Sequence, residues 1–394
     1  MSQLSKLDKL LQVFCPDGVE YKTIGEIATD IFRGSGIKRE QVTETGMPCV
    51  RYGEIYTTYG VWFDACVSHT DESTITSKKY FEHGDILFAI TGESVEDIAK
   101  CTAYIGKERC LAGGDIVVLR HNQDPKYLSY ALSTTDARKQ KSKGKVKSKV
   151  VHSSVPAIKE LIVPIPPLPV QREIVRILDN FTELTAELTA ELTARKKQYE
   201  YYRDTLFTFT DEIEYKTLPK ISENCDRQRK PVTKGNRQAG EYPYYGASGI
   251  VDYVADYIFD GDYLLVSEDG ANLLARSTPI AFSISGKNWV NNHAHVLKFN
   301  FAELQKYVEI YLNSIDLSKY ISGGAQPKLN QDNLNKIPIP VPSDDEVKKI
   351  VGVLTRFDTL CNDLTSGLPA EIEARQKQYE YYRDKLLSFE NIKR

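Results

Sequence analysis

Residues 194–204 read ARKKQYEYYRD and residues 374–384 read ARQKQYEYYRD, so one eleven-residue segment occurs twice with a single difference. The two copies lie 180 residues apart. A repeat with so long a period indicates a duplicated domain rather than a short stacked unit of a solenoid. We therefore expect two similar halves, each able to contact one part of a two-part target.

The duplication continues outside this segment. Residues 19–24 (VEYKTI) resemble residues 213–218 (IEYKTL), and the Pro-Ile-Pro at 164–166 returns at 338–340. Residues 8–11 and 384–387 both read DKLL, so the chain begins where its own repeat ends. A cyclic, pseudo-two-fold arrangement that had been cut open would show this order, with its termini close together.

Each half reads as an entry strand, a variable globular head, a proline-rich turn and a long helix. We predict an α+β fold in which two tandem α/β heads are separated by two long antiparallel helices of a coiled coil. The predicted order is first head (with a short N-terminal helix), first turn and helix, second head, and second turn and helix. These parts cover residues 1–163, 164–209, 210–337 and 338–394.

Composition narrows the class of protein. The 394 residues are enough for two or three domains with cores of their own. No apolar run reaches the roughly 18 residues of a membrane span, and the start shows no signal-peptide pattern, so we expect a cytoplasmic protein. The seven cysteines lack metal-ligand spacing and are expected to be reduced. With a formal net charge of −3, any DNA binding must come from local basic patches.

Apolar residues in the first long helix recur in steps of four and three between residues 174 and 209, with two polar interruptions. This spacing predicts a coiled-coil seam. The second helix needs an extra four-residue step near Gly367 and Pro369, where we expect it to be kinked or broken. The alternative is a pair of ordinary amphipathic core helices. The predicted helix–helix and partner interface consists of Leu178, Phe181, Leu188, Leu192, Tyr199, Tyr202, Leu354, Phe357, Leu364, Tyr379 and Tyr382.

The first head carries a basic run at residues 138–149, RKQKSKGKVKSK, with lysine at every second position. In an extended conformation this period would place six ammonium groups on one side, where a polyanion would neutralise them. The alternative is a solvated, flexible loop. The candidate DNA-binding residues of this head are Arg33, Lys38, Arg39, Arg138, Lys139, Lys141, Lys143, Lys145, Lys147 and Lys149.

The corresponding position of the second head is a glycine-rich loop, residues 322–330 (SGGAQPKLN). Glycine permits close approach of the backbone to a phosphate, and glutamine and lysine can reach base edges or the DNA backbone. For any single basic residue, simple solvation is the alternative. The candidate DNA-binding residues of this head are Arg229, Arg237, Tyr244, Tyr245, Gly323, Gly324, Gln326 and Lys328.

Patterns that carry catalysis are weak in this chain. Residues 16–22 (PDGVEYK) imitate the PD…ExK pattern of metal-dependent nucleases, but their acidic residues are too close together to share a metal from separate strands. His293 and His295 alternate in a predicted strand without a third ligand nearby, which favours ordinary hydrogen-bonded histidines. A phosphate-binding glycine loop and the Asn-Pro-Pro-aromatic motif of adenine methyltransferases are absent from the sequence. We therefore predict no catalytic or metal-binding residues, and a chain that binds and positions.

Two heads, each followed by a Pro-Ile-Pro turn and a heptad helix that ends in QYEYYRD, resemble the specificity subunit of type I restriction-modification systems over essentially the whole chain. The first helix also contains the tetrad Thr-Ala-Glu-Leu twice, at 185–192. Residues 324–329 (GAQPKL) and 242–246 (YPYYG) are similar to recurrent motifs of target recognition domains. The four additional residues near 367–372 depart from the family pattern.

The resemblance implies that each head is a target recognition domain that reads one half of a bipartite, asymmetric site in double-stranded DNA. It also implies that the antiparallel helices set the spacer and dock two methyltransferase (modification) subunits, which use S-adenosylmethionine to form N6-methyladenine. Restriction subunits that hydrolyse ATP with magnesium, translocate DNA and cleave it would join outside. The chain itself would be non-catalytic, without a cofactor of its own and without membrane contact.

Two alternatives stay open on the sequence alone. A coiled-coil scaffold that joins other proteins without DNA would need the same helices, and the lysine run would be incidental. A standalone nuclease is the more distant alternative. Retention of random duplex DNA that is lost at high salt would separate a DNA reader from a scaffold, whereas metal-dependent cleavage by the chain alone would identify a nuclease.

Overall fold

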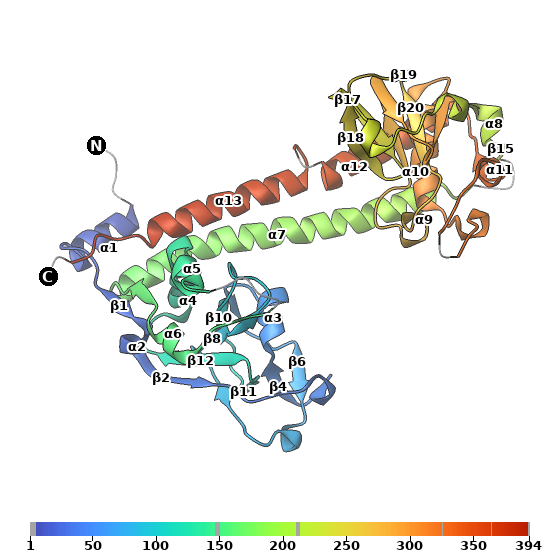
Figure 1. Ribbon diagram of the computed structural model, residues 1–394. Coiled ribbons are helices and arrows are strands. Elements are labelled where there is room, and N and C mark those ends of the chain that lie inside the picture. The colour runs from blue at the N-terminus through green and yellow to red at the C-terminus, as the bar shows by residue number, and fades with distance from the viewer. Residues whose placement is uncertain (1–4, 146–149, 210–212, 325, 364, 393–394) are drawn as a thin grey trace. The chain divides into compact units, whose positions relative to one another are not determined.

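The structure, a computed structural model, describes residues 5–145, 150–209, 213–324, 326–363 and 365–392. The chain divides into two compact units: unit 1 is Met1–Leu188 with Ile372–Arg394, and unit 2 is Thr189–Glu371 (Figure 1). Helix α7 (Leu168–Leu206) contributes its first half to unit 1 and its second half to unit 2. The unit boundaries therefore fall inside the long helices.

Unit 1 begins with a capped helix and a short strand. α1 (Lys6–Phe14) starts after Ser5, whose hydroxyl accepts a hydrogen bond from the backbone N–H of Asp8, while the Asp8 carboxylate accepts one from the backbone N–H of Ser5. This reciprocal capping box satisfies two N–H groups that a helix start leaves unbonded. The strand β1 (Tyr21–Thr23) then pairs antiparallel with β14 (Ile162–Pro164), which leads into α7.

Two five-stranded sheets form the first head, with strand orders β2-β12-β8-β10-β5 and β3-β6-β4-β11-β7, and β9 pairs with β13. The strands are β2 (Ala28–Arg33), β3 (Val42–Thr43), β4 (Met47–Val50), β5 (Trp62–Phe63), β6 (Ser68–Thr70), β7 (Tyr80–Phe81), β8 (Ile86–Ala89), β9 (Thr91–Gly92), β10 (Cys101–Tyr104), β11 (Cys110–Ala112), β12 (Ile116–His121) and β13 (Val151–His152). The short helices of this head are α2 (Ile24–Ile27), α3 (Tyr52–Thr57), α4 (Pro125–Ser133), α5 (Thr135–Ser142) and α6 (Val155–Lys159).

The central strands β8 and β12 of the first head are covered on both faces. Phe88 and Val117 belong to a core shared with α4, the start of α7 and the end of α13 (Leu368–Leu386). Leu87 and Val118, which point to the opposite face, belong to a second core shared with the other five-stranded sheet. Alternate side chains of a strand point to opposite faces, so a continuous apolar strand supplies both cores.

Unit 2 repeats this plan with a smaller head. β15 (Tyr215–Thr217) pairs antiparallel with β24 (Pro338–Pro340), and two four-stranded sheets, β16-β23-β20-β21 and β18-β17-β22-β19, form the head. α10 (Ala302–Ser314) lies against β20, β21 and β23. The strands are β16 (Ser222–Asn224), β17 (Ala239–Gly246), β18 (Gly249–Val254), β19 (Phe259–Asp260), β20 (Tyr263–Ser267), β21 (Ala281–Ile284), β22 (Lys287–Val290) and β23 (Ala294–Phe299). The remaining helices are α8 (Leu218–Ile221), α9 (Asn272–Ala275), α11 (Gln331–Leu334) and α12 (Asp344–Asn362).

The strand pairs that close the two heads match in detail. β1 with β14 and β15 with β24 pair in the same register, tyrosine opposite the last proline. In unit 1 the buried Tyr127 hydroxyl donates a hydrogen bond to the Pro164 carbonyl over 2.9 Å, and in unit 2 the buried Tyr307 hydroxyl donates to the Pro340 carbonyl over 2.8 Å. The predicted tandem repeat is therefore confirmed within each unit.

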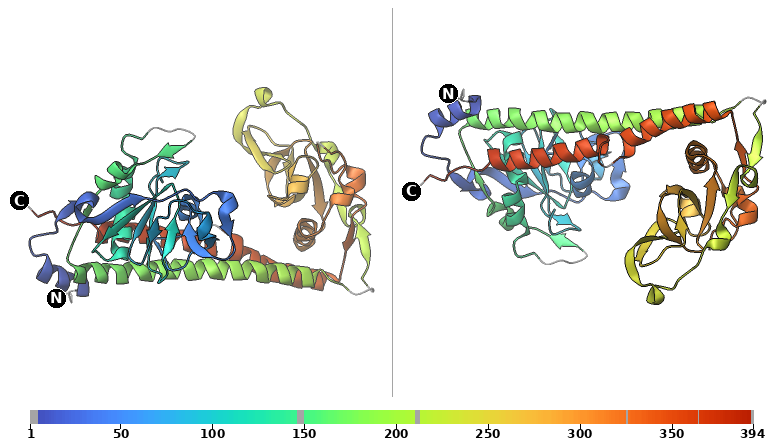
Figure 2. Two further views of the ribbon diagram at one scale, coloured as in Figure 1. Left: turned by 90° about the horizontal axis from the view of Figure 1, so that it is seen from below. Right: turned by 90° about the horizontal axis from the view of Figure 1, so that it is seen from above.

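The two halves of α7 pack antiparallel against different helices. In unit 1 the Phe181 ring stacks on the Tyr382 ring of α13, with 5.4 Å between centroids, and both views of Figure 2 show α13 beside the start of α7. In unit 2 the Tyr202 ring lies 5.5 Å from the Phe357 ring of α12. Each pair joins a phenylalanine of one helix to a tyrosine of a QYEYYRD segment on the other. The predicted antiparallel helix pairs and their duplication are confirmed.

Exposure along α7 follows the predicted seam from Ile174 to Tyr199, whereas Tyr202, the next predicted seam position, is 37% exposed. Leu184 lies off the seam and is 36% exposed, although it is as apolar as its seam neighbours. The buried or half-buried seam positions are Ile174, Leu178, Phe181, Thr185, Leu188, Leu192, Arg195 and Tyr199. This periodic burial is the pattern expected for helices that pack along one stripe.

The second long helix is broken at the predicted place. Residues 363–367 separate α12 from α13, and Leu364, a predicted interface residue, lies outside the described residues. Gly367 is buried, and a Cβ there would meet the carbonyl oxygen of Thr359 at 2.5 Å, which leaves no room for a side chain. Pro369 lies in the first turn of α13, where its missing N–H costs no helical hydrogen bond. The four-residue step in the heptad is therefore taken up by a turn.

None of the helices in the described ranges is both long and apolar enough to cross a membrane.

Candidate nucleic-acid interface

The basic run of the first head starts as a helix, and the predicted extended conformation is wrong. α5 covers residues 135–142, and the Thr134 hydroxyl caps it by accepting a hydrogen bond from the backbone N–H of Ala137 over 3.3 Å. A threonine cap and Asp136 in the first turn favour a helix start, and they outweigh the alternation of lysines. Lys147 and Lys149 lie outside the described residues.

The helix distributes the basic side chains around its axis, because residues turn by about 100° each at 3.6 residues per turn. Lys141 is only 7% exposed, and its ammonium donates to the Cys101 sulfur over 3.5 Å. This burial contradicts the prediction that Lys141 presents its charge to DNA. Lys145, beyond the helix, is half-buried. The exposed basic residues of this segment are Arg138, Lys139 and Lys143.

The other basic candidates of the first head differ in how they are held. Arg33, at the end of β2, places Nη2 2.6 Å from Oδ1 of Asp115, so its charge is partly neutralised. Lys38 and Arg39 lie at a short 3₁₀ helix (Arg39–Gln41) and are exposed. Neither of them forms an ion pair with any residue in the described ranges. Lys38 and Arg39 are therefore available to an external anion.

Two candidates of the second head belong to its core. Tyr244 is 1% exposed, and its hydroxyl accepts a hydrogen bond from the backbone N–H of Val232 over 2.9 Å. The Arg237 guanidinium lies over the Tyr244 ring, 4.3 Å from its centroid, and pairs with Asp252 at 3.0 Å. The predicted DNA contact of Tyr244 is wrong, because its strand turns this side chain inwards. Tyr245, the next residue along β17, is half-buried.

A charge network that the sequence did not reveal lies inside the second head. His295 is 1% exposed; its Nδ1 lies 2.6 Å from Oδ2 of Asp226 and its Nε2 lies 2.8 Å from the Leu329 carbonyl oxygen. Both partners are hydrogen-bond acceptors, so the fold places this buried imidazole between a carboxylate and a backbone carbonyl. Burial raises the pKa of Asp226, but the hydrogen bond and charge of His295, the backbone N–H of Val296 and the charge of Arg229 together outweigh burial and bring this pKa below its usual value.

Arg229 belongs to the same network. Its side chain is 14% exposed, and its guanidinium lies 2.7 Å from Glu268 and 3.4 Å from Asp226. The guanidinium also donates to the Ala294 carbonyl over 2.8 Å. The prediction that Arg229 contacts DNA is contradicted, because its donors serve two buried carboxylates. Lys328 approaches the other oxygen of Glu268 at 3.3 Å while its side chain stays 52% exposed.

The glycine-rich loop of the second head is built onto this network. Ser322 and Lys328 exchange backbone hydrogen bonds of 2.8 and 2.7 Å, which close the loop. Gly323 has φ +83°, and a Cβ there would meet the Gln326 carbonyl oxygen at 2.5 Å, so this position requires glycine. His295 and Glu268 hold the following residue, Leu329, through its carbonyl and its N–H. Gln326 and Gly324 are exposed, so the loop presents polar groups from a fixed base.

The helix ends contain an exposed pair of tyrosines that the heptad seam does not predict. Tyr201 is 67% exposed and Tyr381 is 62% exposed, and each ring meets that of the next tyrosine edge-on. Tyr379, predicted at an interface, is 8% exposed and packs in the core of unit 1, and Tyr199 packs against the core of unit 2. The sequence does contain a sign of this role: tyrosine occurs at the same position of both repeated segments, at a place that lies off the seam.

Groups that could hold a metal are not gathered in the described part of the chain. There, no three or more His, Cys, Asp or Glu side chains cluster as metal ligands would. In the nuclease-like pattern, Lys22 pairs with Glu20 at 3.0 Å, and Lys216 pairs with Glu214 at 3.2 Å in the repeat. These residues belong to the strands that close each head and the segments before them. His293 lies 2.8 Å from Asp269.

A family model matches the chain twice. Its description is type I restriction modification DNA specificity domain, and the matched residues are 16–195 and 210–374. Each match contains one head and a part of the helix that follows it. The duplication read from the sequence is thus a duplication of this domain.

Curated relatives carry the same description. The specificity subunit of the type I restriction enzyme EcoprrI of Escherichia coli is 30% identical over 393 residues, which is 93% of each chain. The EcoR124I/EcoR124II specificity subunit of Escherichia coli is 36% identical over 257 residues, 59% of this chain and 63% of that one. A putative specificity subunit of Haemophilus influenzae is 37% identical over 185 residues, so the match spans about half of that relative, 48%.

Solved structures share the fold. The S subunit of a type I restriction-modification system from M. genitalium gives a TM-score of 0.57 at 17% identity, covering 94% of this chain and 96% of that one. A chain from a structure of type I complex assembly and conformational transition gives 0.62 at 14% identity, covering 95% and 98%. Since the specificity-domain model matches most of the chain and the EcoprrI subunit aligns along nearly all of it, this chain belongs to the family of type I restriction-modification specificity subunits, whose role is DNA sequence specificity.

Proposed function

We propose that the chain reads a bipartite, asymmetric site in double-stranded DNA, with one half-site for each head. The observation that carries this proposal is the presence of two specificity domains in one chain. Their closing strands and helix contacts are alike, whereas the heads differ, with two five-stranded sheets in one and two four-stranded sheets in the other. Because the two heads differ in structure while the strands and helices that hold them are alike, each head would select a different half-site.

Each head offers DNA a different set of contacts. In the first head, exposed cations suit phosphate contacts, which position a protein on DNA without reading bases. These cations are Lys38, Arg39, Arg138, Lys139 and Lys143. In the second head, the fixed loop presents Gln326, whose amide can donate and accept at once, as recognition of an adenine edge requires. Lys328 beside it keeps its side chain 52% exposed for a phosphate.

The repeated helix faces support a proposal for partners. Tyr201 with Tyr202 and Tyr381 with Tyr382 form matching pairs in the two units, and the outer tyrosine of each pair is more than 60% exposed, at 67% and 62%. Exposed aromatic rings are typical of protein interfaces. Because the face occurs twice, we propose that two copies of one methyltransferase subunit dock there, and that restriction subunits join this assembly.

The chemistry is assigned to those partners in this proposal. S-adenosylmethionine would be bound by the methyltransferase subunits, and ATP and magnesium by the restriction subunits. The chain itself would contribute recognition and positioning without catalysis. The resulting complex would methylate adenine at N6 or cleave DNA according to the state of the site.

DNA retention separates this function from its rivals. The full chain, alone or with its partners, is run with random duplex DNA in gels over a series of salt concentrations. A DNA reader retains DNA at low salt, and its binding constant falls linearly with salt on logarithmic axes. A scaffold that joins proteins without DNA would retain none at any salt. A standalone nuclease would cleave the duplex when a divalent metal is added to the purified chain.

A further inference from the structure

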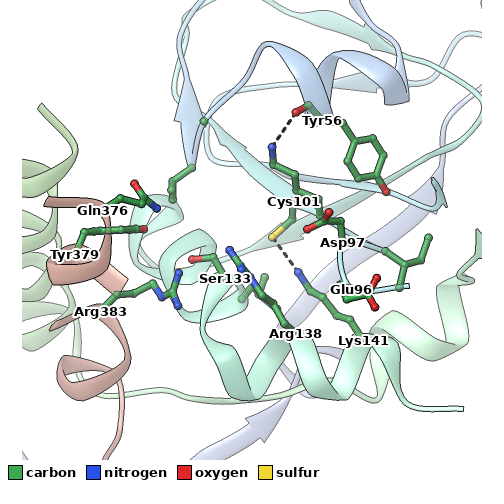
Figure 3. A pocket seen from close by; sticks show the side chains of 15 residues that line it. Tyr56, Glu96, Asp97, Cys101, Ser133, Arg138, Lys141, Gln376, Tyr379 and Arg383 are labelled. Atoms are coloured by element: carbon green, nitrogen blue, oxygen red, sulfur yellow. Dashed lines mark hydrogen bonds between the residues drawn. The ribbon is translucent and has the colours of Figure 1, made fainter. Parts of the chain in front are cut away.

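A cavity of about 420 Å³ lies in unit 1 between the first head and α13 (Figure 3). Its walls come from α3, residues 96–101, the α4–α5 corner and one face of α13. The volume is within the range of small-molecule sites, which begins at about 300 Å³. Of the cations proposed to contact DNA, Arg138 alone lines this space, so DNA contact does not account for its other polar groups.

One wall holds a buried cation. Lys141 is 7% exposed, and its ammonium contacts the Cys101 sulfur at 3.5 Å but forms no ion pair with any described residue. Burial lowers the pKa of Lys141, the Cys101 sulfur opposes this shift, and the like charge of Arg138, one turn earlier on α5, adds to it. A buried ammonium that faces another cation is unfavourable unless an anion joins them.

The opposite wall offers a hydroxyl without a partner. Tyr379 is 8% exposed, and among the described residues its hydroxyl has no hydrogen-bond partner. Burial raises the pKa of this phenol, and the charge of the nearby Arg383 acts against that rise. Figure 3 shows Tyr379 and Arg383 extending from α13 towards Ser133 and Arg138 on the head. A buried, unpaired hydroxyl aimed into a cavity calls for a ligand atom.

Arg383 has donors to spare at the same place. It is 2% exposed, and Asp384 receives its Nε over 2.8 Å and lies 2.7 Å from Nη2. This arrangement leaves Nη1 for a further acceptor. Arg138, across the cavity, forms no ion pair with any described residue, so the N–H donors of its guanidinium are available to a ligand. Two guanidinium groups and an ammonium around one space match the several oxygens of a phosphate.

We propose that this cavity binds a small free ligand that carries a phosphate on a sugar, of about the size of a nucleoside monophosphate. The phosphate would lie among Arg138, Lys141, Tyr379 and Arg383. Glu96 and Asp97 also line the cavity, and their carboxylates can accept hydrogen bonds from sugar hydroxyls. A ligand held by both the head and α13 would join these two parts of unit 1.

The repeat supplies an internal comparison. Tyr199 and Arg203 occupy in unit 2 the positions that Tyr379 and Arg383 occupy in unit 1. The Arg203 side chain is 23% exposed, against 2% for Arg383. The burial of this arginine therefore differs between the two described units, and the equivalent residues of unit 2 serve as controls.

Binding is tested on the full chain by thermal denaturation and calorimetry. The probes are adenosine monophosphate, ribose 5-phosphate, inorganic phosphate, adenosine and acetate, all at one ionic strength adjusted with sodium chloride. The two phosphosugars should raise the unfolding midpoint, inorganic phosphate should raise it less, and adenosine and acetate should leave it unchanged. Equal shifts with all anions, or none, would overturn the proposal. Displacement of the phosphosugars by short duplex DNA would also overturn it, since the phosphate would then be that of DNA.

Two matched pairs of variants locate the site. Tyr379→Phe removes a hydroxyl that has no partner, so the free chain should keep its midpoint while phosphosugar binding weakens about tenfold; Tyr199→Phe should bind as the parent does. Arg138→Gln should weaken binding by a similar factor, whereas Lys139→Gln, its exposed neighbour outside the cavity, should not. Equal losses in the Arg138 and Lys139 variants would show a general electrostatic effect, and equal losses in the two tyrosine variants would show an effect outside the cavity. Either result would refute the site. The other cations proposed to contact DNA lie outside the cavity, so failure of phosphosugar binding leaves the proposed function untouched.

Discussion

The exposed tyrosines of the helix ends allow us to calculate how much free energy each could contribute to partner binding. Tyr201 is 67% exposed and Tyr381 is 62% exposed. A fully buried tyrosine removes roughly 150–250 Å² from water, so a partner that covers either ring would bury about 130 Å² of it. At about 25 cal/mol per Å² this burial contributes about 3 kcal/mol. That free energy corresponds to roughly a hundredfold in Kd.

Replacing each tyrosine by serine should weaken partner binding enough to reduce the number of bound methyltransferase subunits. Because the two tyrosines are equivalent in the repeat, Tyr201→Ser and Tyr381→Ser should each lose one of two methyltransferase copies, and the double variant should lose both. Native mass spectrometry counts the copies at a protein concentration between the parent and variant Kd values. Tyr253→Ser, which changes a tyrosine on β18 that is 52% exposed, is the control and should keep two copies. Two bound copies in both single variants would refute the reasoning.

Three further predictions concern the heads and the helix break. The double variant Lys139→Gln, Lys143→Gln should flatten the salt dependence of DNA binding by up to about 2 in logarithmic slope, about 0.9 for each phosphate contact; an unchanged slope would exclude α5 from the DNA. Asp226→Asn should cost about 3–5 kcal/mol in urea unfolding near neutral pH because Arg229, whose side chain is 14% exposed, loses a carboxylate partner and His295 loses a hydrogen-bond partner. Folding lowers the pKa of Asp226, so the stabilisation by its carboxylate is fully present above the unfolded pKa of about 3.9 and is lost as the pH falls through the pKa of the folded state. If the parent remained more stable than Asp226→Asn in stronger acid, the stabilisation would not come from the ionised Asp226 carboxylate. Gly367→Ala should lower the free energy of unfolding by about 1–3 kcal/mol because its Cβ clashes with the backbone, whereas Gly352→Ala, in open space on α12, should raise it by about 0.5–1 kcal/mol. If both variants changed the free energy of unfolding in the same direction, the turn at Gly367 would not require glycine.

The repeated frame could be predicted from the sequence because its determinants are local. The closing strands, the proline turns and the helix seams each depend on residues within a few positions of one another, and each occurs twice. Gly367 and Pro369 likewise indicate the break between α12 and α13 through their own backbone preferences. Local patterns of this kind reflect intrinsic backbone and packing preferences, which do not depend on distant parts of the chain.

The side chains of the heads were predicted less well, for two physical reasons. Alternating lysines favour an extended strand only if nothing else starts a helix, and Thr134 does so here. The burial of Tyr244 depends on the register between β17 and β22, which a single strand does not encode. The network of Asp226, Glu268 and His295 joins residues about 70 positions apart in sequence, so only the folded chain brings them together.

Recognition by two heads means that each head of one chain selects its own half of a DNA site. The decisive measurement is genome-wide mapping of N6-methyladenine in cells that contain this chain and its methyltransferase partner, against cells that lack the chain. We expect a bipartite motif with a fixed gap, present only with the chain, and a Gln326→Ala chain that relaxes one half-site while the other stays unchanged. Methylation that does not depend on the chain, or a motif with a single continuous part, would contradict recognition by two heads.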